Sequence, residues 1–216
     1  MVVSKKKDVR LNEILDAAEV LFATKGYEGT TVNDILHKVN IGKGTFYYYF
    51  ESKEEVMNRM IQRVVDRYVE AADTIVRNPA RTAHEKFAQI ILGQSVNISG
   101  KKDMVDELHQ TGNAVLHHKS LTATILALSP LLGDIVCQGI EEGTFRTAHP
   151  YETIELLLTA NQFLFDQGIF GWKEEEIWQK ILAFIDNMEL LLGTEKGSFA
   201  YIAEAYCSLN GGWNEK

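Results

Sequence analysis

Apolar residues recur along this chain at spacings of three and four, which is the period of an α-helix that buries one face. The first series begins at Leu11 and stops before Gly26, a residue that can end a helix because it tolerates positive φ. Thr31 and Asp34 then form a capping-box pattern, and the apolar face of the helix that they start reaches Val39. The chain is therefore predicted to begin with a pair of helices.

A short third helix and a long fourth helix follow. Residues 40–42 form a turn that contains a glycine, and the stretch 44–50 is predicted to be helical. Ser52 and Glu55 form a second capping-box pattern, and the fourth helix runs to about Arg77. Two helices joined by such a turn are typical of a helix-turn-helix, which lays its second helix in the major groove of DNA.

Helical periodicity continues to the end of the chain. The further predicted helices cover about 82–97, 103–118, 120–142 with a kink at Pro130, 150–166, 174–192 and a short segment at 199–207. With three prolines in 216 residues and almost no alternating β-type runs, the sequence predicts an all-α fold. We expect two domains, 1–55 and 56–216, that share the fourth helix, because no flexible linker separates them.

The charge is unevenly distributed. A net charge of −8 and a pI near 5.3 argue against a protein that binds nucleic acid over its whole surface. Residues 1–53, however, carry eight Lys or Arg against seven Asp or Glu, which is about +1 and leaves about −9 for the remainder. Binding of DNA through the N-terminal part is therefore compatible with the composition.

The compartment is indicated by what the sequence lacks. Cys137 and Cys207 have neither the number nor the spacing of a disulfide framework or a metal site, which suits a reducing environment. The basic start of the chain is not followed by the apolar region of a signal peptide, and no stretch approaches the roughly 20 apolar residues that span a bilayer. We expect a soluble, cytoplasmic protein that makes no membrane contact.

Five aromatic rings crowd the predicted third helix in the stretch KGTFYYYF. Phe46 and Phe50 are four residues apart and are expected to face the core. Tyr47 and Tyr48 are expected to face DNA, where a ring can meet a thymine methyl group and a hydroxyl can meet a phosphate oxygen. For Tyr49, DNA contact and packing against the fourth helix both stay open.

Lys43 and Lys53 bracket the aromatic helix and are placed to meet backbone phosphates. The run ILDAAEVLFATKGYEGTTVNDILHKVNIGKGTFYYYFESKEEVMNRMI resembles the DNA-binding domain of the TetR family of bacterial transcriptional regulators. Its most specific part, GTFYYYFESKEE, is similar to the family's signature of Gly-Thr and aromatic residues followed by Phe-x-Ser-Lys-Glu. The match covers about a quarter of the chain and departs from the family pattern at Leu36, where alanine is usual, and at Asn40, where glycine is usual.

The resemblance implies DNA contacts at the start of the second helix and along the third. It suggests a phosphate contact at Thr31, a base contact at Asn33 and a phosphate-binding lysine at Lys53. The remaining implied contacts, to bases or phosphates, lie on the recognition helix at Lys43, Gly44, Thr45, Tyr47 and Tyr48.

For the rest of the chain the resemblance is one of layout. It implies a homodimer that binds a palindromic double-stranded DNA operator as a repressor and releases it when a small-molecule effector enters the C-terminal domain. Residues 1–55 would then form a three-helix helix-turn-helix DNA-binding domain, and 56–216 a helical ligand-binding and dimerisation domain. The last two long predicted helices, 150–166 and 174–192, are apolar enough to form a four-helix dimer interface.

Three polar residues interrupt apolar faces of the C-terminal helices. His109, Asn161 and Gln162 are each either hydrogen-bonding groups in the core or lining residues of the effector pocket. The adjacent His117 and His118 point about 100° apart on a helix and cannot share a simple chelate, so no metal site is expected.

Catalytic motifs are missing from the sequence. No GxSxG, HExxH, P-loop or GxGxxG motif is present, and no Cys/His pair has a recognisable spacing. We therefore expect no catalytic residue, no enzymatic activity and no cofactor. The alternative is a helical small-molecule-binding protein, or an enzyme, with a vestigial helix-turn-helix, and DNA binding is the observation that separates these functions.

Overall fold

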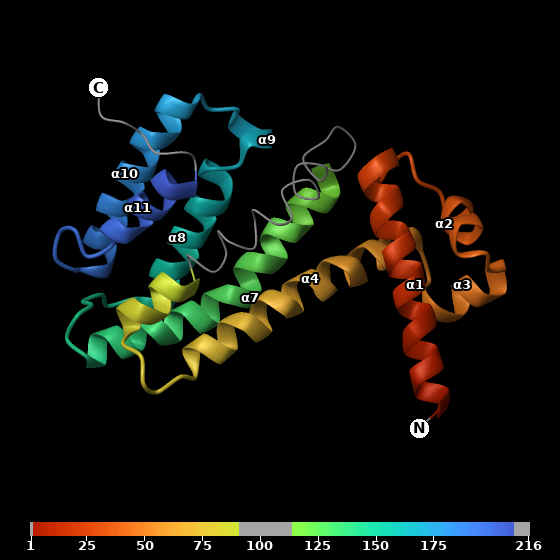
Figure 1. Ribbon diagram of the computed structural model, residues 1–216, viewed down its shortest axis with the longest axis horizontal. Coiled ribbons are helices and arrows are strands. Elements are labelled where there is room, and N and C mark those ends of the chain that lie inside the picture. The colour runs from red at the N-terminus through yellow and green to blue at the C-terminus, as the bar shows by residue number, and fades with distance from the viewer. Residues whose placement is uncertain (1, 91–113, 210–216) are drawn as a thin grey trace. The chain divides into compact units, whose positions relative to one another are not determined.

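The computed structural model describes residues 2–90 and 114–209, and within these ranges every regular element is a helix (Figure 1). The predicted all-α fold is confirmed. Two helices, α4 (Lys53–Val76) and α7 (Ala114–Glu141), each contribute to both of the compact units into which the chain divides. The described residues of the first unit are 2–67 and 114–123, and those of the second are 68–90 and 124–209.

The first unit is built on α1 (Val2–Lys25), α2 (Val32–Val39) and α3 (Lys43–Tyr49), together with the first turns of α4. Its core consists of side chains from these four helices that are almost completely buried: Ile14, Ala18, Phe22, Ile35, Phe46, Phe50, Val56 and Met57. A helix as short as α3 is unstable alone, so this burial is what keeps it folded.

The ends of the first helices follow the sequence signals. Gly26 ends α1 with φ of 76°, and Asn40 ends α2 in the left-handed region with φ of 55°. The capping box of Thr31 and Asp34 forms as predicted. The helix α1 begins at Val2, earlier than the predicted start at Leu11. The residues before Leu11 were not predicted to be helical because they lack apolar periodicity, but they include lysines and an arginine, which favour helix.

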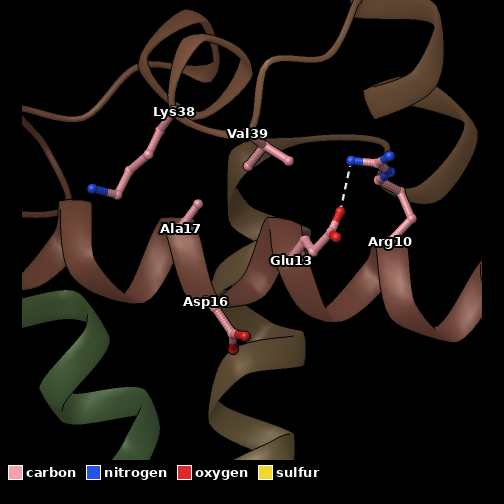
Figure 2. Close-up of a pocket in the computed structure, with 6 residues that line it drawn as sticks. All are labelled: Arg10, Glu13, Asp16, Ala17, Lys38 and Val39. Atoms are coloured by element: carbon pink, nitrogen blue, oxygen red, sulfur yellow. Dashed lines mark ion pairs between the residues drawn. The ribbon is translucent and has the colours of Figure 1, made fainter.

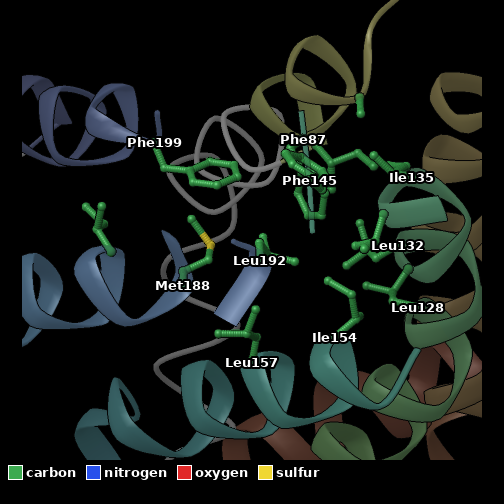
Figure 3. Packing of buried hydrophobic residues seen from close by; sticks show 14 of the residues in the cluster. Phe87, Leu128, Leu132, Ile135, Phe145, Ile154, Leu157, Met188, Leu192 and Phe199 are labelled. Atoms are coloured by element: carbon green, nitrogen blue, oxygen red, sulfur yellow. The ribbon is translucent and has the colours of Figure 1, made fainter. Parts of the chain in front are cut away.

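The second unit packs several helices around one apolar core (Figure 3). Besides parts of α4 and α7 it contains a helix over 83–90, α8 (Pro150–Leu164), α9 (Gln167–Phe170), α10 (Glu174–Leu192) and α11 (Ala200–Leu209). The core residues labelled in Figure 3 come from most of these elements: Phe87, Leu128, Leu132, Ile135, Phe145, Ile154, Leu157, Met188, Leu192 and Phe199. The predicted start of α8 at Pro150 and the predicted span of α10 are confirmed.

One predicted helix boundary is wrong. The sequence suggested an end at 118 and a new start at Ser120, but residues 119 and 120 lie inside the continuous helix α7. Serine costs little within a helix, and the buried residues Leu116 and Leu121 hold the two sides of this point in the same core. Pro130 lies inside α7, within the predicted helix 120–142. The short helix α9 was not predicted.

The helix α7 is long and apolar enough to cross a membrane by length and composition alone. This qualifies the expectation that no stretch of the chain comes near that requirement. Its apolar residues are used in folding, since Leu116 and Leu121 are buried in the first unit and Leu128, Leu132 and Ile135 in the second. Such burial explains its composition as that of a core helix.

A buried lysine fixes the end of α4 within the second unit. Lys86 is 4% exposed, and its Nζ donates to the carbonyl oxygen of Val76 and to Oε1 of Gln138, both at 2.6 Å. Because Val76 ends α4, the ammonium satisfies a carbonyl that the helix leaves free and complements the negative end of the helix dipole. The C-terminal end of α4 is thereby tied to α7.

Candidate nucleic-acid interface

The helix α3 separates its aromatic rings into a buried and an exposed side. Phe46 and Phe50 are 0% and 1% exposed, whereas Tyr47 and Tyr48 are 56% and 68% exposed. Tyr49 is half-buried, and its ring meets that of Tyr48 edge-on with 5.0 Å between the centroids. The predicted core positions of the two phenylalanines are confirmed, and α3 offers two tyrosines to a partner.

The N-terminus of α2 is held by a network around Asp34. The backbone N–H and the hydroxyl of Thr31 donate to Oδ2 of Asp34 at 2.7 and 2.6 Å, and the backbone N–H of Asp34 donates to Oγ1 of Thr31 at 3.2 Å. Lys25 donates to Oδ1 of Asp34 at 2.7 Å. The hydrogen bond from Lys25, followed by those from Thr31, holds the pKa of Asp34 well below its ordinary value. The helix end is thus firmly set, and Asn33 stands exposed beside it.

The residues that open α3 leave room for a partner. Lys43, Gly44 and Thr45 are all exposed, and Lys43 forms no ion pair with any residue that the structure describes. A Cβ atom added at Gly44 would meet nothing within 4 Å. An unpaired ammonium next to an open helix start is suited to a phosphate oxygen.

Lys53 has a different environment from Lys43. Its Nζ donates to the backbone oxygens of Tyr27 and Thr30 at 2.7 and 2.8 Å, and it lies 4.1 Å from the centroid of the Tyr27 ring. Lys53 is half-buried, and two of its three N–H donors are used inside the protein.

Ion pairs fix α4 to its neighbours in the first unit. Arg63 forms a fork from α4 to α1, in which Nη1 meets Oδ1 of Asp16 and Nη2 meets Oε2 of Glu19, both at 2.6 Å. Lys119 of α7 reaches the start of α4, where it meets Oε1 of Glu54 at 2.6 Å and Oδ1 of Asn58 at 3.1 Å. Sequence reasoning missed these pairs because their members lie 44 to 65 residues apart.

A surface depression lies between α1 and α2 (Figure 2). Two cations and two carboxylates line it together with two apolar residues: Arg10, Lys38, Glu13, Asp16, Ala17 and Val39. Arg10 pairs with Glu13 at 2.6 Å, as the dashed line in Figure 2 marks. Charges of both signs in a depression open to solvent do not match the mostly apolar, enclosed site that a small effector needs.

Of the three predicted pocket residues, the structure describes two. His109 lies outside the described residues. Asn161 is exposed and Gln162 is half-buried, both in the last turn of α8. Their assignment to an effector pocket stays a prediction, as do the eight DNA contacts.

Two family models match this chain. The one described as "Bacterial regulatory proteins, tetR family" matches residues 14–60, which contain α2 and α3. The one described as "Tetracyclin repressor-like, C-terminal domain" matches residues 95–187. The first match covers the second half of α1, all of α2 and α3 and the start of α4, and the second ends within α10.

Known transcriptional regulators are similar to this chain, some over most of their length and some over part of it. The uncharacterised helix-turn-helix regulator YfiR of Bacillus subtilis is 38% identical over 183 residues, which are 81% of this chain and 87% of YfiR. The negative regulator IcaR of the biofilm operon icaADBC in Staphylococcus epidermidis is 37% identical over 67 residues, so the match spans only 35% of IcaR. The solved structure of SmeT, the repressor of the Stenotrophomonas maltophilia efflux pump SmeDEF, shares the fold with a TM-score of 0.64 at 17% identity, over 88% of this chain and 92% of SmeT.

The similarity to YfiR covers both units, and the family match contains the exposed recognition helix with its buried phenylalanines. This chain therefore belongs to the TetR family and is a DNA-binding transcriptional regulator.

Proposed function

We propose that this regulator is a repressor that binds a palindromic operator as a homodimer and is released when a small-molecule effector binds its C-terminal domain. The observation that carries the proposal is the division of α3, in which Phe46 and Phe50 are buried while Tyr47 and Tyr48 are exposed. Two exposed aromatic rings on adjacent residues form an apolar surface that a partner is expected to cover. The family match at this helix supports double-stranded DNA as that partner.

The proposed DNA contacts lie on α3 and at the start of α2. Tyr47 and Tyr48 meet bases or phosphates in the major groove, and Lys43, Gly44 and Thr45 meet the edge of the same groove. At the start of α2, Thr31 contacts a phosphate and Asn33 a base edge; the backbone N–H groups of this helix end add a favourable dipole. The resemblance implies Lys53 as a further phosphate contact, but its ammonium donates hydrogen bonds to the backbone oxygens of Tyr27 and Thr30.

The proposed dimer forms through α8 and α10. Three leucines on these helices remain exposed in the single chain, Leu156 at 57%, Leu182 at 42% and Leu190 at 77%. Two helices from each protomer can pack as a four-helix bundle about a two-fold axis, which buries the same surface on both copies. Binding to successive major grooves requires the two copies of α3 to lie about one DNA turn, roughly 34–36 Å, apart.

Effector response is proposed to act through α4. This helix takes part in both units, starts a short turn after α3 and ends at Val76, whose carbonyl oxygen accepts from the buried Lys86. An effector that favours another arrangement of the C-terminal helices would disfavour the spacing that DNA needs. Such coupling is typically about 1–3 kcal/mol, or roughly a 5- to 150-fold change in operator affinity.

The relatives support repression and a small effector. IcaR is named as a negative regulator, and SmeT is a repressor that has also been solved in complex with triclosan. For this chain, the pocket is proposed to lie among the C-terminal helices, with His109, Asn161 and Gln162 as its polar lining. A cytoplasmic location follows from the role, since the operator is cytoplasmic in bacteria.

The test is binding to the DNA upstream of the protein's own gene in a gel-shift titration. The wild-type chain is expected to retard this fragment, with an affinity that falls steeply with salt. Tyr47→Ala is expected to abolish retardation without lowering the melting temperature, and Leu126→Ala, which trims another exposed apolar side chain on α7, serves as the control. Absent binding would instead favour a helical ligand-binding protein or an enzyme with a vestigial helix-turn-helix.

A further inference from the structure

Lys53 is the first residue of α4, and its ammonium points into the protein. Two backbone oxygens accept hydrogen bonds from it, that of Tyr27 at 2.7 Å and that of Thr30 at 2.8 Å. The face of the Tyr27 ring covers a further side, with 4.1 Å between Nζ and the centroid. A compact ammonium with rotatable donors fits such a site, whereas a guanidinium is larger and holds its donors in a rigid fork.

The two carbonyls belong to a rigid connection between α1 and α2. Gly26 turns the chain with φ of 76°. Thr30 is 1% exposed, and its hydroxyl donates to the backbone oxygens of Gly26 and Leu21 at 2.8 and 3.2 Å. The ring of Phe22 packs edge-on against that of Tyr27 at 5.2 Å. The oxygens that meet Lys53 are therefore held in fixed positions.

The residue after this connection is Thr31, the N-cap of α2. Lys53 itself follows α3 by a turn of three residues, so its hydrogen bonds join the end of the recognition helix to the start of α2. Both ends of the helix-turn-helix that face DNA in the proposed function are thus fixed to the first turn of α4.

We propose that Lys53 is a positioning residue that sets the N-terminus of α2 against α3 and α4, and that it does not neutralise a DNA phosphate. This rests on the proposed function. Because Lys53 belongs to α4, a shift of α4 moves α2 as well as α3, and the base-reading Asn33 moves with them. Lys43, in contrast, is exposed and forms no ion pair with a described residue, so its ammonium is available to a DNA phosphate.

The experiment compares salt dependence between lysine variants. Binding to a 30-base-pair duplex from upstream of the protein's own gene is measured from about 50 to 200 mM salt, for the wild type, Lys53→Met, Lys53→Arg and Lys43→Gln. Losing one phosphate contact makes the slope of log K against log salt less steep by about 0.9, so a substitution present in both protomers of the proposed dimer makes it less steep by about 1.8. We expect this decrease for Lys43→Gln and an unchanged slope for Lys53→Met. The affinity of Lys53→Met is expected to fall by roughly fivefold or more, the effect of losing a base contact.

Lys53→Arg keeps the charge and separates the two roles further. It is expected to bind more weakly than the wild type, because the rigid fork of a guanidinium does not reproduce the hydrogen bonds of the ammonium to the two carbonyls. If Lys53→Met fails to fold, Tyr27→Leu replaces it: this change removes the ring beneath the ammonium but leaves the lysine charged. Tyr27→Leu is expected to weaken binding with an unchanged slope.

Four results would overturn the proposal. A slope less steep by about 1.8 in Lys53→Met, or affinity retained in Lys53→Arg, would make Lys53 a phosphate contact. A lower melting temperature with unchanged affinity of the folded protein would make it merely structural. Absent binding by the wild type and by Lys43→Gln alike would reject the proposed function itself, and the positioning role with it.

Discussion

Arg63 of α4 and Glu19 of α1 form an ion pair across the first unit, with 2.6 Å between Nη2 and Oε2 and side chains that are 25% and 23% exposed. The same guanidinium meets Oδ1 of Asp16 at 2.6 Å, so one arginine joins α4 to two successive turns of α1. These ion pairs join α4 to α1 within the first unit. They add directional polar bonds to the apolar packing between the helices of this unit.

Arg63→Met is expected to lower the free energy of unfolding by about 1–2 kcal/mol, because a partly buried Glu19 carboxylate loses its charged donor. Urea denaturation followed by circular dichroism measures the change. The control is Arg59→Met on the same helix, since Arg59 is exposed and forms no ion pair with a described residue. It should stay within about 0.5 kcal/mol of wild type. Equal effects of the two substitutions would show that the fork adds nothing.

Gly139→Ala is expected to destabilise the second unit. An added Cβ would lie 2.2 Å from Cδ2 and 2.6 Å from Cγ of Phe145, whose ring is 3% exposed and packed against Phe87 and Phe199. Such overpacking typically costs about 1–3 kcal/mol. The melting temperature should therefore fall, whereas Gly44→Ala, where a Cβ meets nothing within 4 Å, should not lower it. An unchanged melting temperature for Gly139→Ala would mean that Phe145 is free to move.

Stability is expected to fall as the pH is lowered below the ordinary pKa of histidine, about 6.5. Burial between the rings of Phe145 and Phe199 lowers the pKa of His84, and the nearby Glu142 carboxylate opposes this only in part. The folded state therefore binds fewer protons than the unfolded state just below pH 6.5, so stability is full above this pH and is lost as pH falls towards the folded pKa. His84→Gln should flatten the decrease in melting temperature between pH 7.5 and 5.5. The exposed His118→Gln should leave it unchanged, and identical pH profiles for both variants would contradict this origin.

How far the sequence predicts this molecule depends on how local each determinant is. The burial of Phe46 and Phe50, the exposure of Tyr47 and the ends of α2 follow from spacing and caps within one or two turns, and all were predicted. The environment of Lys53 was not, because its two acceptors lie 23 and 26 residues away and are backbone atoms with no sequence signal. The family resemblance assigns Lys53 to a phosphate, whereas its hydrogen bonds are made to backbone oxygens within the protein.

The continuity of α7 shows the other limit. The sequence suggested a helix start at Ser120, where the chain does not begin a helix. Here Leu116 and Leu121 are buried on either side of it, and the helix continues between them. Tertiary packing thus overrides a local preference of a few tenths of a kcal/mol. The assignment of His109, Asn161 and Gln162 to the pocket stays a prediction, since a polar residue on an apolar face is equally consistent with a core hydrogen bond and with a ligand contact.

Leu190→Glu is expected to dissociate the proposed dimer and to weaken operator binding. Leu190 is 77% exposed on α10, and on a two-fold axis each substitution introduces a charge into both copies of the interface, where it must be buried without a partner. Monomers lose the effective concentration that links two half-sites, so operator affinity should fall by roughly 10²-fold. Sedimentation velocity measures the dimer, and gel shift the affinity. Leu126→Glu, at a residue 69% exposed on α7, is the control and should remain dimeric. A dimer that survives Leu190→Glu with full affinity would assign the interface to another surface.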